Sequence, residues 1–291
     1  MDTTNVIQLL YGIPGVLTYF LVIYAMRRVR RVLNKSFIII YTITAAVNTA
    51  AWLNSWVTLR LRSEPFFFSY YEWAAANPLF RNTLLFLIPH FYYAQNACVL
   101  LLTFDRFAVI YSITRDTRWW NDLYVFIAVS LHILCLIVNL ETRLPIDGVY
   151  NLNNESNGYI VVYDKTVNYN IVLATNVQLA FGVIIFLSCS LLNMLSLRQL
   201  IILRRKISIA KEFSFFLISF CIFIAQVLNL AIVVFYSFVF FFSDNDAPSR
   251  SNPYLLTDLM SFTSDLFSIG PAFYTVLLPG PIRRWVMQKI R

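Results

Sequence analysis

The sequence predicts an all-α membrane protein: a bundle of seven transmembrane helices with the N-terminus outside the cell and the C-terminus in the cytosol. Hydrophobic residues make up 59% of the 291 residues and charged residues only 13%, about half the charged fraction of a soluble domain. Seven apolar stretches each approach the ~20 residues that cross a bilayer as a helix. Basic residues gather on alternate connections between them, a pattern that predicts the orientation of a multi-pass chain.

Short polar connections separate the apolar stretches, so we expect residues 1–291 to form a single membrane domain. The expected spans are residues 6–26, 37–59, 82–104, 123–140, 170–197, 213–242 and 254–278. No basic segment precedes the first span and no small-residue cleavage site follows it; the basic run that begins at Arg27 comes after it instead. This order favours a retained helix over a cleaved signal peptide.

The distribution of Lys and Arg predicts the orientation, because basic connections are translocated poorly. With the N-terminus outside, only six of the 23 basic residues lie on the outer side: Arg60, Arg62, Arg81, Arg143, Lys165 and Arg250. The other 17 lie on the cytosolic side, and this asymmetry also favours an odd number of spans. The basic run at residues 204–206, in the third inner connection, either anchors the topology, attracts anionic lipid or contacts a cytosolic partner.

Two further sequence features concern modification and redox state. The sequon Asn154-Glu155-Ser156 lies in the second outer connection, where it would be glycosylated. A second sequon, at Asn34, lies in an inner connection and is expected to stay unmodified. The four cysteines lie within apolar stretches and form no Cys-x-x-Cys pair: Cys98, Cys135, Cys189 and Cys221. We interpret them as small buried hydrophobic residues rather than as a disulfide framework.

Opposite charges stand at the inner end of the third span, where Asp105 is followed directly by Arg106. Charges at this depth are costly unless they are paired and reach the headgroups. One interpretation is a boundary charge pair of the kind common in membrane proteins. The other is a two-state latch, in which Asp105 holds Arg106 in one state and Arg106 meets a partner protein in the other. The position in the third of seven spans favours the latch.

The seventh span contains Asp265, the only acidic residue deep within an expected span. An intramembrane acid is a functional candidate, although a hydrogen-bonded packing residue is an equally good interpretation. In the same span, Pro271 removes a helix hydrogen bond and predicts a kink. Tyr274 follows about one turn later, toward the cytosol. The kink and this tyrosine are a candidate moving part.

Polar and aromatic side chains are frequent in the outer halves of the spans, where a pocket between helices would orient a small ligand. We select seven candidate ligand-binding residues: His90, Tyr92, Tyr93, Asn96, Asn176, Gln226 and Asn229. The third span is the best candidate for a wall of the pocket, because Pro89 breaks a helix hydrogen bond directly before His90. For any one of these residues, hydrogen bonding between helices is the more common role.

Motifs for catalysis, metal binding and nucleic-acid binding are lacking. The sequence has two histidines, no His-Glu-x-x-His and no Gly-x-Ser-x-Gly, so we expect neither an enzyme nor a cofactor. A metal site built from His90, His132 and Asp265 would require three distant spans to converge. The net charge of +8 is spread between apolar runs, which argues against nucleic-acid binding. A small transporter or channel stays open as the rival class, with Asp265, Gln226 and Asn229 as the start of a polar path.

Four short segments, taken in order, carry a resemblance to a known family: Tyr11-Gly12-Ile13-Pro14-Gly15, Leu53-Asn54-Ser55-Trp56-Val57, Leu102-Thr103-Phe104-Asp105-Arg106-Phe107 and Gly270-Pro271-Ala272-Phe273-Tyr274. The first opens the first span, the second closes the second span, the third closes the third span, and the fourth lies in the seventh. Over nearly its whole length the chain resembles the nematode serpentine receptor class gamma family and, more broadly, the G-protein-coupled receptors.

The resemblance implies a chemosensory receptor in the plasma membrane of sensory neurons or their cilia. It implies binding of a small organic cue, pheromones among them, and activation of a heterotrimeric G protein. By position, it assigns Asp105 and Arg106 to an ionic latch and Tyr274 to the tyrosine of the seventh-span Asn-Pro-x-x-Tyr motif. The chain departs from rhodopsin-like receptors at Phe107, which replaces the tyrosine of the Asp-Arg-Tyr triplet, and at Gly270, which replaces the seventh-span asparagine. The proline of the sixth span, the aspartate of the second and the cysteine at the top of the third are also missing.

Overall fold

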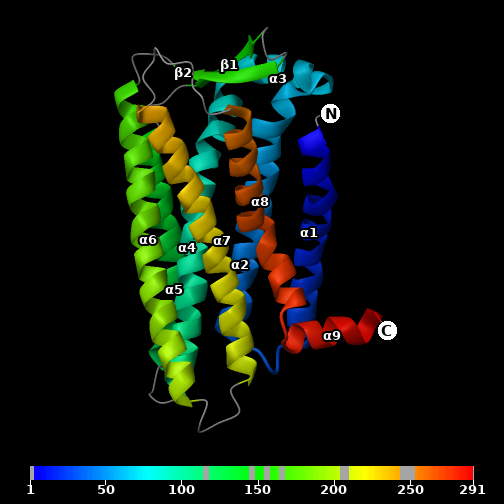
Figure 1. The fold of residues 1–291 in the computed structure, drawn as a ribbon, viewed down its shortest axis with the longest axis vertical. Helices are drawn as coiled ribbons and strands as arrows, with labels where there is room; N and C mark the ends of the chain where they lie inside the picture. Colours follow the sequence, from blue (N-terminus) through cyan, green and yellow to red (C-terminus); the bar gives the residue numbers. More distant parts are fainter. Residues whose placement is uncertain are drawn as a thin grey trace.

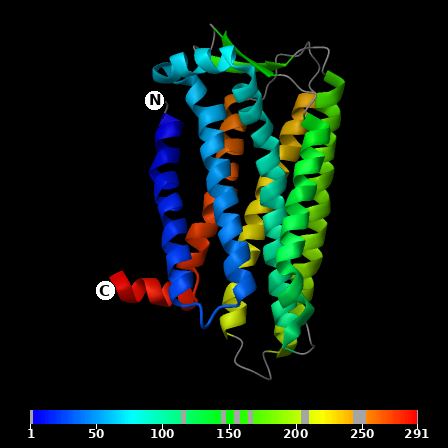
Figure 2. The same cartoon turned by 180° about the vertical axis from the view of Figure 1, so that it is seen from behind.

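Long helices run side by side through the length of the molecule, as Figures 1 and 2 show from opposite sides. The computed structural model describes residues 3–113, 118–143, 148–153, 158–163, 168–203, 210–242 and 253–290. The long helices of this described part are α1 Thr3–Arg28, α2 Lys35–Ser55, α4 Pro78–Ser112, α5 Arg118–Arg143, α6 Asn168–Leu203, α7 Ala210–Phe242 and α8 Pro253–Leu277. Shorter elements lie at their ends: η1 Trp56–Arg60, η2 Leu61–Ser63, η3 Pro65–Phe67, α3 Phe68–Ala76, β1 Gly148–Asn153, β2 Gly158–Tyr163 and α9 Pro281–Ile290. The sequon at Asn154 and the basic run at 204–206 lie outside the described residues.

Within the described ranges, six of the long helices are long and apolar enough to cross a membrane: α1, α2 with its continuation to Arg60, α4, α5, α6 and α7. The criterion leaves out α8, whose described part carries Asp265 and several serine and threonine hydroxyls that lower its mean hydropathy. These helices confirm the predicted class of an all-α membrane protein.

The helices extend beyond the spans that apolarity alone indicates. Pro78–Ser112 covers the expected span at 82–104, and Arg118–Arg143 covers the one at 123–140. A helix satisfies its own backbone hydrogen bonds, so it continues into the headgroup region, where the sequence is no longer uniformly apolar. Pro78 stands at the first turn of α4, where its missing N–H costs nothing and its fixed φ suits a helix start.

The two ends of the bundle are capped differently. One end carries α3 and a two-stranded hairpin, and α9 lies across the other end (Figure 1). The N-terminus lies toward the hairpin end, and the chain ends in α9. The hairpin is antiparallel, with Gly148 opposite Tyr163 and Asn153 opposite Gly158. Only a connection was expected there, because two short strands of mixed composition carry little periodic signal.

An aromatic cluster fastens the hairpin to α3 and to the end of α2. The ring centre of Tyr71 lies 5.3 Å from that of Tyr150 and 5.6 Å from that of Tyr159. Burial raises the pKa of Tyr71, so its hydroxyl stays protonated. That hydroxyl donates a hydrogen bond of 2.7 Å to the carbonyl of Val57. The cluster thereby fixes η1, the continuation of α2 that carries Arg60.

The helix α4 lies at the centre of the bundle and contacts α2, α5, α6 and α7. Every side chain from residue 92 to residue 99 is buried. Small side chains at Ala94, Ala97 and Cys98 allow the neighbouring helices to approach this segment closely. Because α4 has neighbours on all sides, the two charges near its α9 end are enclosed by other helices.

Gly15 permits close contact between α1 and α8, since a Cβ atom at this position would overlap Cγ2 of Ile269. We expect Gly15→Ala to lower the unfolding free energy in detergent by roughly 1–3 kcal/mol, the usual cost of overpacking. Adding Ile269→Ala should recover part of that loss, because it removes the clashing atom. Gly280→Ala is the matched control, since the nearest atom to its Cβ would lie 3.7 Å away. Equal thermal midpoints for the two glycine variants would contradict this packing.

Candidate functional site

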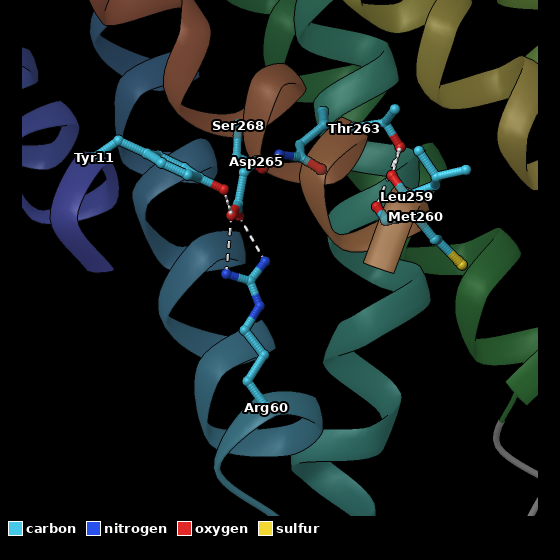
Figure 3. Close-up of polar contacts among 8 residues, drawn as sticks. Tyr11, Arg60, Leu259, Met260, Thr263, Asp265 and Ser268 are labelled. Carbon is cyan, nitrogen blue, oxygen red and sulfur yellow. Dashed lines mark hydrogen bonds and ion pairs between the residues drawn. The ribbon is translucent and has the colours of Figure 1, made fainter. Parts of the chain in front are cut away.

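A buried ion pair joins α2 to α8 toward the hairpin end of the bundle. The Arg60 guanidinium donates to Asp265 from Nη2 to Oδ1 at 2.6 Å and from Nη1 to Oδ2 at 3.0 Å. Tyr11 of α1 donates a further hydrogen bond, from its hydroxyl to Oδ2 at 2.6 Å. Figure 3 shows the side chains of Tyr11 and Arg60 converging on the Asp265 carboxylate. Only 6% of Arg60 and 2% of Asp265 are exposed. Water does not reach either charge, so each is stabilised mainly by the other.

Arg60 reaches Asp265 because the helical path of α2 continues beyond Ser55 through the π-helical turn Trp56–Arg60. The guanidinium lies over the ring of Trp56, 5.0 Å from its centre, a favourable cation–π arrangement. The sequence predicts that Arg60 belongs to the outer side, and in the structure its side chain turns into the bundle at the hairpin end. Asp265 of α8 therefore has a buried cationic partner 205 residues earlier in the chain.

A separate ring of hydrogen bonds lies in the core, one turn of α8 from this pair. Ser268, about one turn from Asp265, accepts at Oγ a hydrogen bond of 2.8 Å from Gln95 of α4. Gln95 also donates to Asn48 of α2 at 3.1 Å, and Asn48 donates to the hydroxyl of Tyr19 at 2.9 Å. Tyr19 of α1 closes the ring by donating to the carbonyl of Ser268 at 2.6 Å. Four helices are thus tied together by buried polar groups.

The next turn of α8 contains the helix break at Pro271. Tyr41 of α2 donates to the Pro271 carbonyl at 3.0 Å. The Thr275 hydroxyl lies 2.8 Å from the same carbonyl and 3.0 Å from the Tyr41 hydroxyl. The ring of Tyr41 packs on Phe37, with ring centres 5.8 Å apart. These contacts lead along α8 and α2 to Phe37. The ring of Phe37 also contacts Arg106, which belongs to a second buried ion pair.

Asp105 and Arg106 form the second buried ion pair, toward the α9 end of α4. Arg106 donates to Asp105 from Nη2 and from Nε, the latter at 3.1 Å. Trp120 of α5 donates from Nε1 to Oδ1 of Asp105 at 2.9 Å. Asp105 is fully enclosed and only 2% of Arg106 is exposed. The pair therefore lies inside the bundle, enclosed by the neighbouring helices.

Arg106 also touches two further helices. Its guanidinium lies 4.5 Å from the ring centre of Phe37 of α2 and 5.4 Å from that of Phe215 of α7. Its Nη1 lies 3.8 Å from Oε2 of Glu212, also in α7. Separating the ends of α4 and α7 would break these contacts. Sequence patterns could not identify Trp120, Glu212 or the two phenylalanines as partners of this pair, because these residues lie on other helices and follow no local pattern.

Tyr274 lies beside the helix break of α8. Its side chain is partly buried and packs against the main hydrophobic core. Gly270 makes room for it, since a Cβ atom at Gly270 would lie 2.6 Å from the Tyr274 hydroxyl. The space needed by Tyr274 therefore explains why glycine stands at position 270, where the receptor motif has asparagine.

Several candidate ligand-binding residues bond to neighbouring helices. Gln226 of α7 donates to Oδ1 of Asn96 at 2.7 Å, and Asn96 donates to the carbonyl of Tyr92 at 2.8 Å. The hydroxyl of Tyr92 fills the space left by Gly182 of α6, where a Cβ atom would overlap it. Asn229 is buried as well. Gln226, Asn96 and Tyr92 thus make contacts between α4, α6 and α7.

The remaining three candidates differ from one another. Tyr93 is fully buried, with its ring 5.0 Å from that of Phe181. His90 is partly buried and stacks on Phe86, with ring centres 6.3 Å apart. Asn176 is exposed on α6, so its inclusion in an inward-facing pocket was wrong. Within the described ranges, no three His, Cys, Asp or Glu side chains gather as metal ligands would.

A cavity of about 490 Å³ lies between α4, α5 and α6 toward the hairpin end. Its walls are mostly apolar, and its polar side chains are Asn82, Thr83, Arg143 and Gln178. Arg143 of α5 donates to Oε1 of Gln178 of α6 at 3.0 Å. The size suits a small organic molecule. The cavity follows α4 up to Pro89, directly before His90, but none of the seven predicted residues lines it.

Long apolar helices packed around buried ion pairs define a multi-pass membrane protein with a polar core. The family model described as Srg family chemoreceptor matches residues 5–286. The chain therefore belongs to the Srg chemoreceptor family, and the resemblance to serpentine receptor class gamma is confirmed. No curated protein matches the chain.

Proposed function

We propose that this Srg chemoreceptor is a G-protein-coupled receptor that detects a small organic cue and activates a heterotrimeric G protein without catalysing a reaction. The supporting observation is the placement of Arg106, which contacts α2 and α7 and, through Asp105, α5. A side chain shared by several helices at one end of a bundle responds to any change in their packing. We assign the receptor to the plasma membrane of sensory neurons or their cilia, where such cues arrive.

The proposed topology has seven spans, with α8 as the seventh. The hairpin end faces outside and the α9 end faces the cytosol, which follows from the excess of Lys and Arg on the cytosolic connections. The polar residues of α8 do not oppose this assignment, because Asp265 and Ser268 are bonded to Arg60 and Gln95 inside the bundle. A paired intramembrane charge costs far less than an unpaired one.

The proposed ligand site is the cavity between α4, α5 and α6. Its apolar walls provide the hydrophobic contact, and Arg143 and Gln178 provide the oriented polar groups that a small ligand needs. The cavity borders the part of α4 that contains Pro89, where the helix lacks one hydrogen bond and bends more easily. A ligand there would press on α4, the helix that carries Asp105 and Arg106.

Direct contacts would transmit a displacement of α4 to α2, α7 and α8. Gln95, on α4, is bonded to Asn48 of α2 and Ser268 of α8. Two turns or more toward the cytosol, Arg106 is bonded to Asp105 and lies near Glu212. In the proposed mechanism, ligand binding shifts α4 against α2 and α8, weakens the contact to α7, and exposes Arg106 to the G protein.

Glu212→Gln is expected to raise ligand-independent nucleotide exchange on the G protein by about two- to fivefold. The substitution removes the charge that attracts Arg106 from α7, and a partly exposed ion pair at 3.8 Å contributes about 0.3–1 kcal/mol. The measurement is guanine-nucleotide exchange in membranes that contain the receptor and a panel of G proteins. Asp122→Asn is the matched control, since Asp122 is an exposed acid of α5 near the same end. No increase relative to this control would rule out the contact between Arg106 and Glu212 as a restraint.

Thr83→Trp is expected to abolish the response to small molecules found in a G-protein-coupled ligand screen. Thr83 lines the cavity but is exposed, so an indole can occupy the cavity without overpacking the core. Leu173→Trp is the matched control, because Leu173 is 47% exposed on α6 and does not line the cavity. Surface expression of both variants is measured in parallel. A retained response in Thr83→Trp at normal expression would place the ligand elsewhere.

The rival proposal, a small transporter or channel, predicts a different readout. It requires ligand-evoked flux through the purified protein in liposomes without a G protein. Asp265 and Gln226, which would begin a polar path, are bonded to Arg60 and Asn96 respectively. Exchange on a G protein without such flux supports the receptor, and flux without exchange supports the rival.

A further inference from the structure

A second cavity, of about 350 Å³, lies at the α9 end of the bundle, far from the proposed ligand site. It is formed by Ser214 near the start of α7, by the turn Pro279-Gly280-Pro281 between α8 and α9, and by Arg283, Arg284 and Met287 of α9. Neither the latch nor the ligand cavity uses these residues. The two guanidinium groups make this cavity a candidate site for an anion.

The helix α9 is held across the bundle end by apolar contacts on one face. Ile282 and Val286 are buried, and the ring of Trp285 packs on Tyr24 of α1 with ring centres 5.6 Å apart. Arg283 and Arg284 are exposed. Figure 1 shows α9 extending sideways from the foot of the bundle, across the direction of the long helices. A short helix with one apolar and one basic side in this position lies in the membrane interface.

The charged side chains of α9 and of the end of α1 are all basic. The helix α9 contains no acidic residue and also carries Lys289, and Arg27 and Arg28 end α1 close by. Helices α1 and α9 are in contact, so these basic side chains share one region of the surface. On the proposed topology, this region faces the cytosolic leaflet, which holds the anionic lipids.

We propose that the cavity between α7, the α8–α9 turn and α9 binds the phosphorylated headgroup of an anionic membrane lipid, with Arg283 and Arg284 as its phosphate ligands. The acyl chains would extend along the neighbouring apolar helices. A volume of about 350 Å³ accommodates a headgroup, whereas a helix of a partner protein is about 10–12 Å wide and needs an open groove. The location at the interface also favours a lipid over a soluble phosphate. The cytosolic placement rests on the proposed topology, but the binding chemistry does not.

The test compares lipid binding by two variants of the full-length protein. Wild type, Arg283→Gln/Arg284→Gln and Arg30→Gln/Arg31→Gln are purified in nanodiscs of phosphatidylcholine with a small fraction of phosphatidylinositol 4,5-bisphosphate. Arg30 and Arg31 are the matched control, because they are exposed near the same end and do not line the cavity. Lipid retained by the protein is measured by native mass spectrometry after release from the disc.

The expected result is a loss of affinity for the phosphoinositide of about 30-fold in Arg283→Gln/Arg284→Gln, roughly fivefold for each guanidinium, and a change below about threefold in the control. Equal retention by all three proteins would overturn the proposal, and so would an equal loss in the control, which would indicate a diffuse charge effect. Both leaflets of a nanodisc contain the lipid, so the result does not depend on the proposed topology. No G protein is present, so the result does not depend on the proposed function either.

Discussion

Asp265→Asn is expected to lower the unfolding free energy of the receptor by about 3–5 kcal/mol, the cost of leaving a buried charge without its partner. Asparagine has nearly the shape of aspartate and still accepts a hydrogen bond from Tyr11. The change therefore removes the charge and little else, and Arg60 is left as a cation with 6% of its surface exposed. The measurement is the thermal unfolding midpoint in detergent, together with the amount of receptor at the cell surface.

A double-mutant cycle separates this ion pair from a general effect of substitution. Arg60→Met alone should also be strongly destabilising, whereas Arg60→Met combined with Asp265→Asn should be closer to wild type than either single variant, because no buried charge remains. Arg62→Met is the control, since Arg62 is only partly buried two residues further on. Additive losses in the cycle would mean that the two charges do not depend on each other.

Arg106→Ala is expected to abolish exchange on the G protein when exchange is counted per receptor at the cell surface. The loss is complete because no neighbouring residue of α4 can replace a guanidinium that contacts side chains of α2 and α7. Asp105 keeps the hydrogen bond of 2.9 Å from Trp120 but loses its cationic partner, so the variant is also expected to be less stable, and surface expression is measured in parallel. The Glu212→Gln background gives a readout that needs no ligand, since its raised basal exchange should disappear when Arg106→Ala is added.

Arg106→Lys distinguishes the roles of charge and shape. Lysine keeps the positive charge but cannot present the planar fork that bonds Asp105 through two nitrogen atoms. We expect exchange to fall at least tenfold. Full exchange with lysine would show that charge alone suffices, and normal exchange in Arg106→Ala at normal expression would eliminate the latch.

The features that could be predicted correctly from the sequence depend on residues that are close together in the chain. Apolar stretches of sufficient length indicate membrane helices whatever their neighbours are. Asp105 and Arg106 are adjacent in the chain, so their pairing could be anticipated. Pro271 is equally visible in the sequence, as a residue without the N–H that a helix hydrogen bond requires.

The features that the sequence could not show arise from packing between distant segments. Asp265 and Arg60 lie 205 residues apart, and an arginine at the end of a span usually indicates only the membrane boundary. The inward direction of the Arg60 side chain depends on the π-helical turn after Ser55, and no pattern of residues predicts that turn. For the same reason, polar residues such as Gln226 and Asn96 were selected as ligand contacts, although they bond to each other. A polar side chain within a span carries no sign of whether its partner is a neighbouring helix or a ligand.

The most direct test concerns the side of the membrane on which each terminus lies, since a receptor must present its two ends to different compartments. Epitope tags are placed before Met1 and after Arg291 and stained with antibody in intact and in permeabilised cells. We predict that the N-terminal tag is stained in intact cells and the C-terminal tag only after permeabilisation. Staining of both tags on intact cells, or of neither, would mean an even number of crossings and would contradict the seven-span receptor.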